Sequence, residues 1–98
     1  MDYQVILSPR AIRDLQEIVR YISFDNPRAA ENFGAQLIEK TRVLVSFPEF
    51  GRTVPEFGEP AIRELIFKPY RIVYRVNHER RVVEVARYWH AARGIPIP

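Results

Sequence analysis

The sequence predicts an α+β fold in the order β-α-α-β-β-β, with a helical hairpin packed on one face of a small, mainly antiparallel sheet. Two segments in the N-terminal half repeat apolar residues at three- and four-residue spacing, which is typical of amphipathic helices. The C-terminal third instead alternates apolar and polar residues, the period of a strand. The chain has 98 residues, and we expect residues 1–98 to form one domain around one core.

The chain is expected to begin with a short strand over residues 3–7, where β-branched and aromatic residues gather. Ser8 then suits the cap of a helix, and Pro9 suits its first position. We predict an amphipathic helix over residues 9–23, because apolar residues recur there at helical spacing: Ile12, Leu15, Ile18, Val19 and Ile22.

A second helix start follows almost at once. Either Asp25 or Asn26 can cap it, and Pro27 fixes the backbone of its first turn. We expect this helix to run to about Ser46, with its buried side formed by Ala30, Phe33, Leu37 and Val43 or Leu44. Because the connection is only two or three residues long, the two helices should form an antiparallel hairpin.

Residues 47–60 lack any regular period. The sequence Pro-Glu-Phe-Gly occurs twice, at 48–51 and 55–58, which is too short a unit for a structural repeat. We interpret the two copies as turns that start at proline and close at glycine. Their phenylalanines, Phe50 and Phe57, are expected to hold this loop against the core.

Three strands are predicted next, over Ala61–Phe67, Tyr70–Asn77 and Arg81–Trp89. The connections between them are too short for crossovers, so the strands should form an antiparallel meander. The strand at residues 3–7 must join this sheet to satisfy its backbone groups, at a position that the sequence leaves open.

The register of the last hairpin follows from its turn. If His78 and Glu79 form a two-residue turn, Asn77 pairs with Arg80 and Val73 lies opposite Glu84. The core face then carries Ile72, Tyr74, Val76, Val83 and Val85. The other face, open to solvent or a partner, carries Arg71, Val73, Arg75, Val82, Glu84, Ala86 and Tyr88, with His90 just beyond.

Composition excludes several classes of protein. The chain has no cysteine, and its two histidines, His78 and His90, are far apart in the sequence, so neither a disulfide scaffold nor a histidine-built metal site is expected. No apolar run reaches the roughly 20 residues of a membrane helix, and the N-terminus lacks the pattern of a secretory signal. We therefore expect a cytoplasmic protein that does not enter the membrane and needs no cofactor or metal.

Charge is distributed unevenly along the chain. Residues 1–59 hold seven cations and nine acids, whereas residues 60–98 hold eight cations and three acids. Thirteen of the fifteen cations are arginines, whose fork of donors suits phosphate or carboxylate. The basic half indicates an anionic partner, either nucleic acid or an acidic protein segment. The alternative is that the arginines serve surface ion pairing.

The arginine face of the sheet is the main candidate site. Arg71 and Arg75 share one side of a strand, with Glu84 diagonal to both in the register above, so they form either an anion site or a salt-bridge ladder. Beside Arg71 and Arg93, His90 could carry a proton near neutral pH.

Other chemistry has weaker support. Tyr88 and Trp89 could stack on bases or close the core, and the core is favoured for Trp89, which has core-face parity. Asp14 and Glu17 interleave with arginines, which predicts a solvated ion-pair face and not an acid–base pair. The sequence has no phosphate-binding glycine loop, zinc-protease motif or nucleophile elbow.

An ordered set of short motifs covers nearly the whole chain. In the N-terminal half they are Leu7-Ser8-Pro9, Asp14-Leu15-x-Glu17-Ile18, Tyr21-Ile22, Asn26-Pro27-x-Ala29-Ala30 and Phe47-Pro48-Glu49-Phe50-Gly51-Arg52. In the C-terminal half they are Arg63-Glu64-Leu65, Tyr70-Arg71-Ile72-Val73-Tyr74-Arg75-Val76 and Val85-x-Arg87-Tyr88-Trp89-His90-Ala91-Ala92-Arg93. Together they resemble the RelE/ParE family of bacterial type II toxin–antitoxin toxins, which includes plasmid-stabilisation modules.

The resemblance implies a growth-inhibiting toxin neutralised by an antitoxin from an adjacent gene, in a hetero-oligomer with it. RelE-type members cut mRNA on the ribosome without metal, whereas ParE-type members poison DNA gyrase. For the nuclease alternative, the resemblance assigns Arg71 to phosphate charge and His90 to proton transfer, with Arg63 as a second phosphate contact. The pair of lysines in those nucleases falls at about Ile62 and Glu64 here, so it is absent.

This departure favours the ParE-like branch, which performs no chemistry of its own. A third alternative is a toxin-fold protein that binds only its antitoxin and operator complex. In any of these, we expect the binding surface to include Arg63, Arg71, Arg75, Tyr88, His90 and Arg93.

Overall fold

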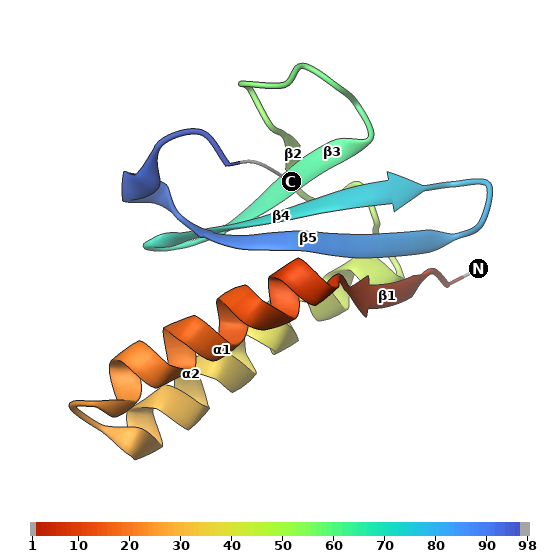
Figure 1. The fold of residues 1–98 in the computed structure, drawn as a ribbon. Helices are drawn as coiled ribbons and strands as arrows, with labels where there is room; N and C mark the ends of the chain where they lie inside the picture. Colours follow the sequence, from red (N-terminus) through yellow and green to blue (C-terminus); the bar gives the residue numbers. More distant parts are fainter. Residues whose placement is uncertain (1, 97–98) are drawn as a thin grey trace.

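The computed structural model describes residues 2–96, which form two layers: a helical hairpin and a five-stranded sheet (Figure 1). The helices cover one face of the sheet, as the sequence predicts. The strand order is β1-β5-β4-β3-β2. The elements are β1 (Gln4–Leu7), α1 (Pro9–Ser23), α2 (Pro27–Glu39), the 3₁₀ helix η1 (Lys40–Val45), β2 (Arg52–Thr53), β3 (Ile62–Phe67), β4 (Tyr70–Asn77), β5 (Val82–His90) and the 3₁₀ turn η2 (Ala91–Arg93).

The helix starts are set by local capping. The Ser8 side chain accepts a hydrogen bond from the backbone N–H of Ala11, and Asn26 does the same for Ala29. Both helices then begin with proline, so the predicted starts are confirmed. The second helix ends earlier than predicted, at Glu39, and continues to Val45 as a tighter 3₁₀ helix. Three of those six residues are β-branched, which lowers their α-helical propensity.

The antiparallel meander of β3, β4 and β5 is confirmed, and β1 adds to its edge by pairing in parallel with β5. The main core lies between the helices and this sheet. Its fully buried members include Leu37, Leu44, Ile72, Tyr74, Val83 and Val85. The core face predicted for β4 and for the start of β5 is therefore correct. Within residues 2–96, no helix is long and apolar enough to span a membrane.

The predicted hairpin register is wrong by two residues. Asn77 pairs with Val82, so the turn is four residues long, and Arg75 lies opposite Glu84. The Asn77 side chain accepts a hydrogen bond from the backbone N–H of Arg80, which stabilises the longer turn, and Arg81 adopts a positive φ of 54°. A shift of two residues preserves which side chains share a face.

A β-bulge changes the second half of β5. Val73 pairs with Arg87 but Tyr74 pairs with Val85, so Ala86 is one extra residue on β5. The bulge reverses the alternation beyond it. Tyr88 consequently joins the main core, and Trp89 lies on the opposite face, which corrects both predictions.

The face of the sheet away from the helices is less open than predicted. Val54 and Phe57 of the loop before β3 pack against Ile62 and Val73 in a second, small cluster. Residues 91–96 fold back so that the Trp89 indole N–H donates to the backbone oxygen of Gly94 at 3.2 Å. Both segments lie above the sheet in Figure 1. Phe50, in contrast, is 65% exposed and does not hold its loop to the core, so that prediction is wrong.

Candidate functional site

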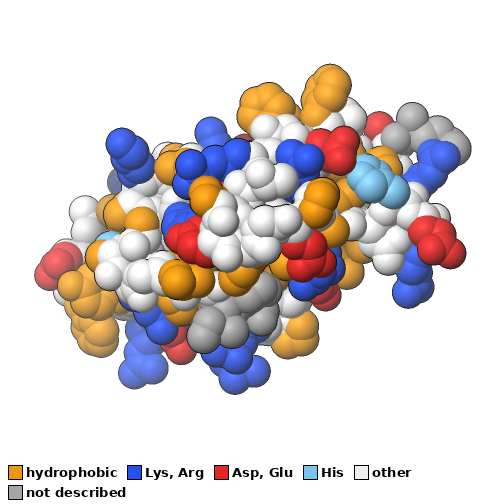
Figure 2. Space-filling model, turned by 90° about the horizontal axis from the view of Figure 1, so that it is seen from above, with side chains coloured by type: hydrophobic (Ala, Val, Ile, Leu, Met, Phe, Trp, Pro, Cys, Tyr) orange, Lys and Arg blue, Asp and Glu red, His pale blue; other side chains and the backbone are white. Residues whose placement is uncertain are grey.

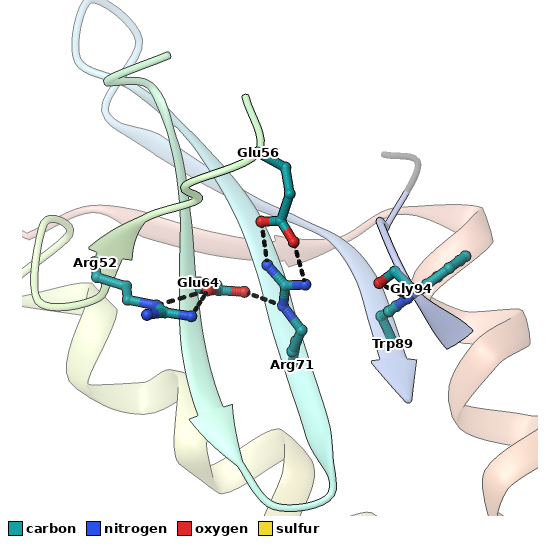
Figure 3. Close-up of polar contacts among 6 residues, drawn as sticks. All are labelled: Arg52, Glu56, Glu64, Arg71, Trp89 and Gly94. Atoms are coloured by element: carbon teal, nitrogen blue, oxygen red, sulfur yellow. Dashed lines mark hydrogen bonds and ion pairs between the residues drawn. The ribbon is translucent and has the colours of Figure 1, made fainter. Parts of the chain in front are cut away.

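Four charged residues meet on the face of the sheet away from the helices, and we call them the Arg71 cluster (Figure 3). Arg52 lies on β2, Glu64 on β3 and Arg71 on β4, whereas Glu56 comes from the loop between β2 and β3. Neighbouring strands bring these side chains together. Arg52 on β2 pairs with Glu64 on β3, and Glu64 pairs with Val73 on β4. Arg71 lies two residues before Val73 and therefore on the same face of the sheet.

Arg71 uses all three of its guanidinium nitrogens within the cluster. Its Nη1 and Nη2 donate to the two carboxylate oxygens of Glu56 at 2.9 and 2.8 Å, and its Nε donates to Glu64 Oε1 at 2.5 Å. Such two-pronged pairing is the strong form of an arginine–carboxylate contact. The hydrogen bond from Arg71 holds the pKa of Glu56 at about 2, below its ordinary 4.5, and the bonds to both glutamates raise the pKa of Arg71.

Glu64 is a buried carboxylate between two arginines. Its second oxygen, Oε2, accepts a hydrogen bond from Arg52 Nε at 2.7 Å and forms an ion pair with Arg52 Nη2 at 2.7 Å. A buried charge needs such partners, because an isolated one is costly to take out of water. The cluster therefore contains two cations and two anions. Figure 2 shows the same mixture across this face, where acidic and basic side chains lie interspersed.

A second buried ion pair, between Asp14 of α1 and Arg87 of β5, lies at the edge of β5 just beyond the residues that pair with β1. Asp14 Oδ2 accepts from Arg87 Nε at 2.7 Å and from the backbone N–H of Tyr88 at 3.1 Å, and Oδ1 accepts from Arg87 Nη2 at 3.0 Å. Asp14 is thus a buried structural group and not part of the solvated face that its sequence neighbours predict.

His90 lies on the helix side of the sheet, away from Arg71. Its ring packs edge-on against Tyr70 with centroids 5.2 Å apart, and its Nδ1 accepts from the backbone N–H of Ala92 at 3.1 Å. Together with Tyr88 and residues of α1 it lines a cavity of about 350 Å³. The expected neighbourhood of His90 and Arg71 is therefore wrong: they occupy opposite faces of the sheet.

Tyr88 is buried beside that cavity. Its hydroxyl is shielded from solvent and has no hydrogen-bond partner within the described part of the chain. Burial raises the pKa of Tyr88 to about 12, so its phenol stays protonated at neutral pH.

The remaining predicted binding residues lie apart from one another. Arg63 is on the helix side of β3, where Nη1 donates to the backbone oxygen of Gly51 at 2.9 Å. Arg75 pairs with Glu59 at 3.3 Å near the surface, and not with Glu84. The guanidinium of Arg93 lies 4.3 Å from the centre of the Trp89 ring. The structure does not bring the predicted set into one site.

An apolar groove lies at the other end of the helix side, between the α2–η1 segment and β3. It has a volume of about 630 Å³, and its lining residues are Gln36, Glu39, Lys40, Arg42, Val43, Phe50, Leu65 and Phe67. Phe50, which fails to hold its loop to the core, contributes an exposed apolar wall of this groove.

Sequence reasoning missed Glu56 and Glu64 as partners of Arg71, and Arg52 as the second partner of Glu64. One signal for Glu64 was available, because it shares strand parity with the buried Ile62 and a charge at such a position requires a partner. No local pattern indicates Glu56, whose contact spans fifteen residues. Among residues 2–96, no group of three or more His, Asp or Glu side chains could hold a metal ion.

Comparisons with known proteins agree on one family. The family model described as the ParE toxin of type II toxin–antitoxin systems matches residues 5–95. Toxin RelE2 of Caulobacter vibrioides is 35% identical over 91 residues, which cover 92% of this chain and 97% of that protein.

Solved structures share the fold at lower identity. The chromosomal ParDE toxin–antitoxin system of P. aeruginosa matches with a TM-score of 0.73 and 20% identity, covering 90% of this chain and 95% of that one. The RelBE2 toxin–antitoxin complex of Mycobacterium tuberculosis matches with a TM-score of 0.65 and 24% identity, covering 92% and 99%.

Proposed function

Because this chain belongs to the RelE/ParE family of type II toxin–antitoxin toxins, we propose that it acts in the ParE manner, by binding and inhibiting DNA gyrase without chemistry of its own. The observation that carries this proposal is the Arg71 cluster. A nuclease would need unopposed cations at this face to stabilise phosphate charge, yet here the Arg71 guanidinium is bonded to the buried carboxylate of Glu64.

The strand beside Arg71 supports the same conclusion. By the resemblance, the pair of lysines in the nucleases of the family falls at about Ile62, which is apolar, and Glu64, which is buried and negative. A carboxylate beside a scissile phosphate would oppose the charge that develops in the transition state. Glu64 therefore works against cleavage at this site and not for it.

The position of His90 also disfavours cleavage. An in-line attack by a ribose hydroxyl needs charge stabilisation and proton transfer at the same phosphate. Arg71 faces away from the helices and His90 faces toward them, so one phosphate cannot contact both side chains in this fold.

We further propose that a cognate antitoxin binds as an amphipathic segment in the groove between the α2–η1 segment and β3, forming a hetero-oligomer. The groove offers apolar side chains, of which Phe50 is exposed and Phe67 is partly buried, and the cations Lys40 and Arg42 in its lining favour acids in the bound segment. The solved relatives named above are toxin–antitoxin systems, which agrees with such a partner.

A paired assay tests the target. Purified chain is added to DNA gyrase in a supercoiling reaction and, separately, to ribosomes programmed with mRNA. We expect supercoiling to be inhibited and the mRNA to stay intact. The RelE-like alternative predicts the reverse: cleaved mRNA and normal supercoiling. The similarity to the toxin named RelE2 supports that alternative.

A growth assay tests whether the chain is toxic at all, whichever target it acts on. Expression of the chain alone should slow bacterial growth, and co-expression of the protein encoded beside it should restore growth. Normal growth at verified expression of folded protein would contradict the toxin function. Inactivity in all three assays with antitoxin binding intact would instead favour a protein that only binds its antitoxin and operator complex.

A further inference from the structure

Glu56 differs from Arg71 and Glu64 in its place in the fold and in the exposure of its side chain. It is the only one of the four that comes from a loop, and its side chain is 29% exposed, whereas that of Arg71 is 10% exposed. Val54 and Phe57 fix the loop on either side of it by packing on the sheet. The Glu56 side chain can therefore swing away from Arg71 while strands and loop anchors stay in place.

A cavity lies where an incoming group would reach Arg71. It has a volume of about 490 Å³, and three cations line it: Arg52, Lys68 and Arg71. Lys68 is exposed and forms no ion pair within residues 2–96. With Glu56 in place these cations face two carboxylates, Glu56 and Glu64. When Glu56 withdraws, only Glu64 remains, and the site carries a net charge of +2.

We propose that Glu56 is a built-in counter-ion, and that a carboxylate from an acidic segment of a protein partner displaces it and binds the Arg71 fork in its place (Figure 3). Glu56 itself shows the geometry, because its planar carboxylate meets the fork with two parallel hydrogen bonds. The inference rests on the proposed function only in taking the partner to be a protein.

The walls of the cavity favour an acidic protein segment over nucleic acid. They include Pro55, Ile66 and Pro69, which suit apolar side chains next to an acid. Binding of single-stranded nucleic acid relies on exposed aromatic faces for stacking. The Tyr70 ring, which also lines the cavity, packs against Phe33 and His90, and Trp89 on this face is only 6% exposed and is covered by Arg93.

The test is a binding titration on the isolated chain with two labelled probes of equal length, decaglutamate and a ten-residue oligothymidylate. Removing the internal competitor with Glu56→Gln should tighten decaglutamate binding by about tenfold, which corresponds to about 1.4 kcal/mol. Glu59→Gln is the matched control, because Glu59 lies on the same loop but pairs with the exposed Arg75. Binding by that variant should change less than about twofold.

Arg71→Lys in the Glu56→Gln background should abolish the gain, because lysine lacks the two-pronged fork. Equal affinity of Glu56→Gln and Glu59→Gln for decaglutamate would overturn the inference and leave Glu56 a purely structural group. Tighter binding of the oligothymidylate than of decaglutamate would overturn the choice of ligand.

The wild-type chain provides a test that needs no folded variant. Decaglutamate should shift the Nε–H resonance of Arg71 before that of Arg75, and the absence of that shift would contradict the inference. Since neither gyrase nor ribosomes enter these titrations, their outcome is independent of the assays of the proposed function.

Discussion

Two arginine–carboxylate pairs of similar geometry have different surroundings. Asp14–Arg87 joins a helix to a strand, and both side chains are almost fully buried. Glu56–Arg71 joins a loop to a strand and borders an open cavity. The first pair also satisfies the backbone N–H of a different strand residue, Tyr88, whereas the arginine of the second pair has another carboxylate partner, Glu64. The comparison teaches that similar bonds can differ in burial and access, and the more accessible pair is the one that we propose to be exchangeable.

The largest expected effect is the loss of Asp14. Asp14→Ala removes the acceptor of three hydrogen bonds at the buried edge of β5, and we expect it to lower the free energy of unfolding by about 3–5 kcal/mol. Glu17→Gln, an exposed change on the same helix, should cost less than about 0.5 kcal/mol. Urea unfolding measures both. Similar, small losses for the two variants would remove the distinction between the pairs.

The next effect concerns the base of the loop that carries Glu56. At Gly51, a Cβ atom would overlap the backbone oxygen of Glu64 and would lie 2.7 Å from the Tyr74 hydroxyl oxygen. Gly51→Ala must therefore shift β2 away from β3, and we expect a loss of about 1–3 kcal/mol in thermal or urea unfolding. A variant as stable as the wild type would show that the loop base is not fixed by this close approach.

Replacing Glu56 should cost less than either of these changes. Glu56→Gln leaves Arg71 bonded to Glu64, and the lost contact is partly exposed, so the expected loss in free energy of unfolding is about 1 kcal/mol or less. A loss as large as that of Asp14→Ala would mean that the two pairs do the same structural work, and it would count against the exchange proposed for Glu56.

The same pair predicts a pH dependence with a definite sign. The folded state holds the pKa of Glu56 at about 2, against an ordinary 4.5, so its contribution to stability is complete above pH 4.5 and is lost as the pH falls toward 2. The stability difference between the wild type and Glu56→Gln should therefore be constant at neutral pH and shrink in acid. Urea unfolding at several pH values measures it, and a difference that grows in acid would reverse the sign of the argument.

The sequence predicts those features that neighbouring residues determine. Ser8 and Asn26 cap their helices locally, and strand period alone identifies the core face of β4. The bulge at Ala86 could not be predicted, because the groups that hold it come from the other end of the chain. The Ser8 hydroxyl donates to the backbone oxygen of Ala86 at 3.0 Å, and Asp14 accepts from the backbone N–H of Tyr88 two residues later.

The candidate site was predicted only in part for the same reason. Arg71 was identified from its charge and its place on a strand. Its partners come from two other segments, and the bulge that places Trp89 on its face is set by distant contacts. The charge composition indicates an anionic partner for the arginines. It does not reveal that two carboxylates of the chain itself are bonded to the Arg71 guanidinium.

The most direct test of the account is the activity of His90→Gln. Glutamine keeps hydrogen bonding but cannot carry a proton near neutral pH, so a nuclease that uses His90 as acid or base would lose roughly 10²-fold or more of its cleavage. We predict that the variant slows bacterial growth and inhibits gyrase supercoiling as the wild type does. Loss of toxicity, with the fold and antitoxin binding intact, would contradict the ParE-like function and establish proton transfer by His90.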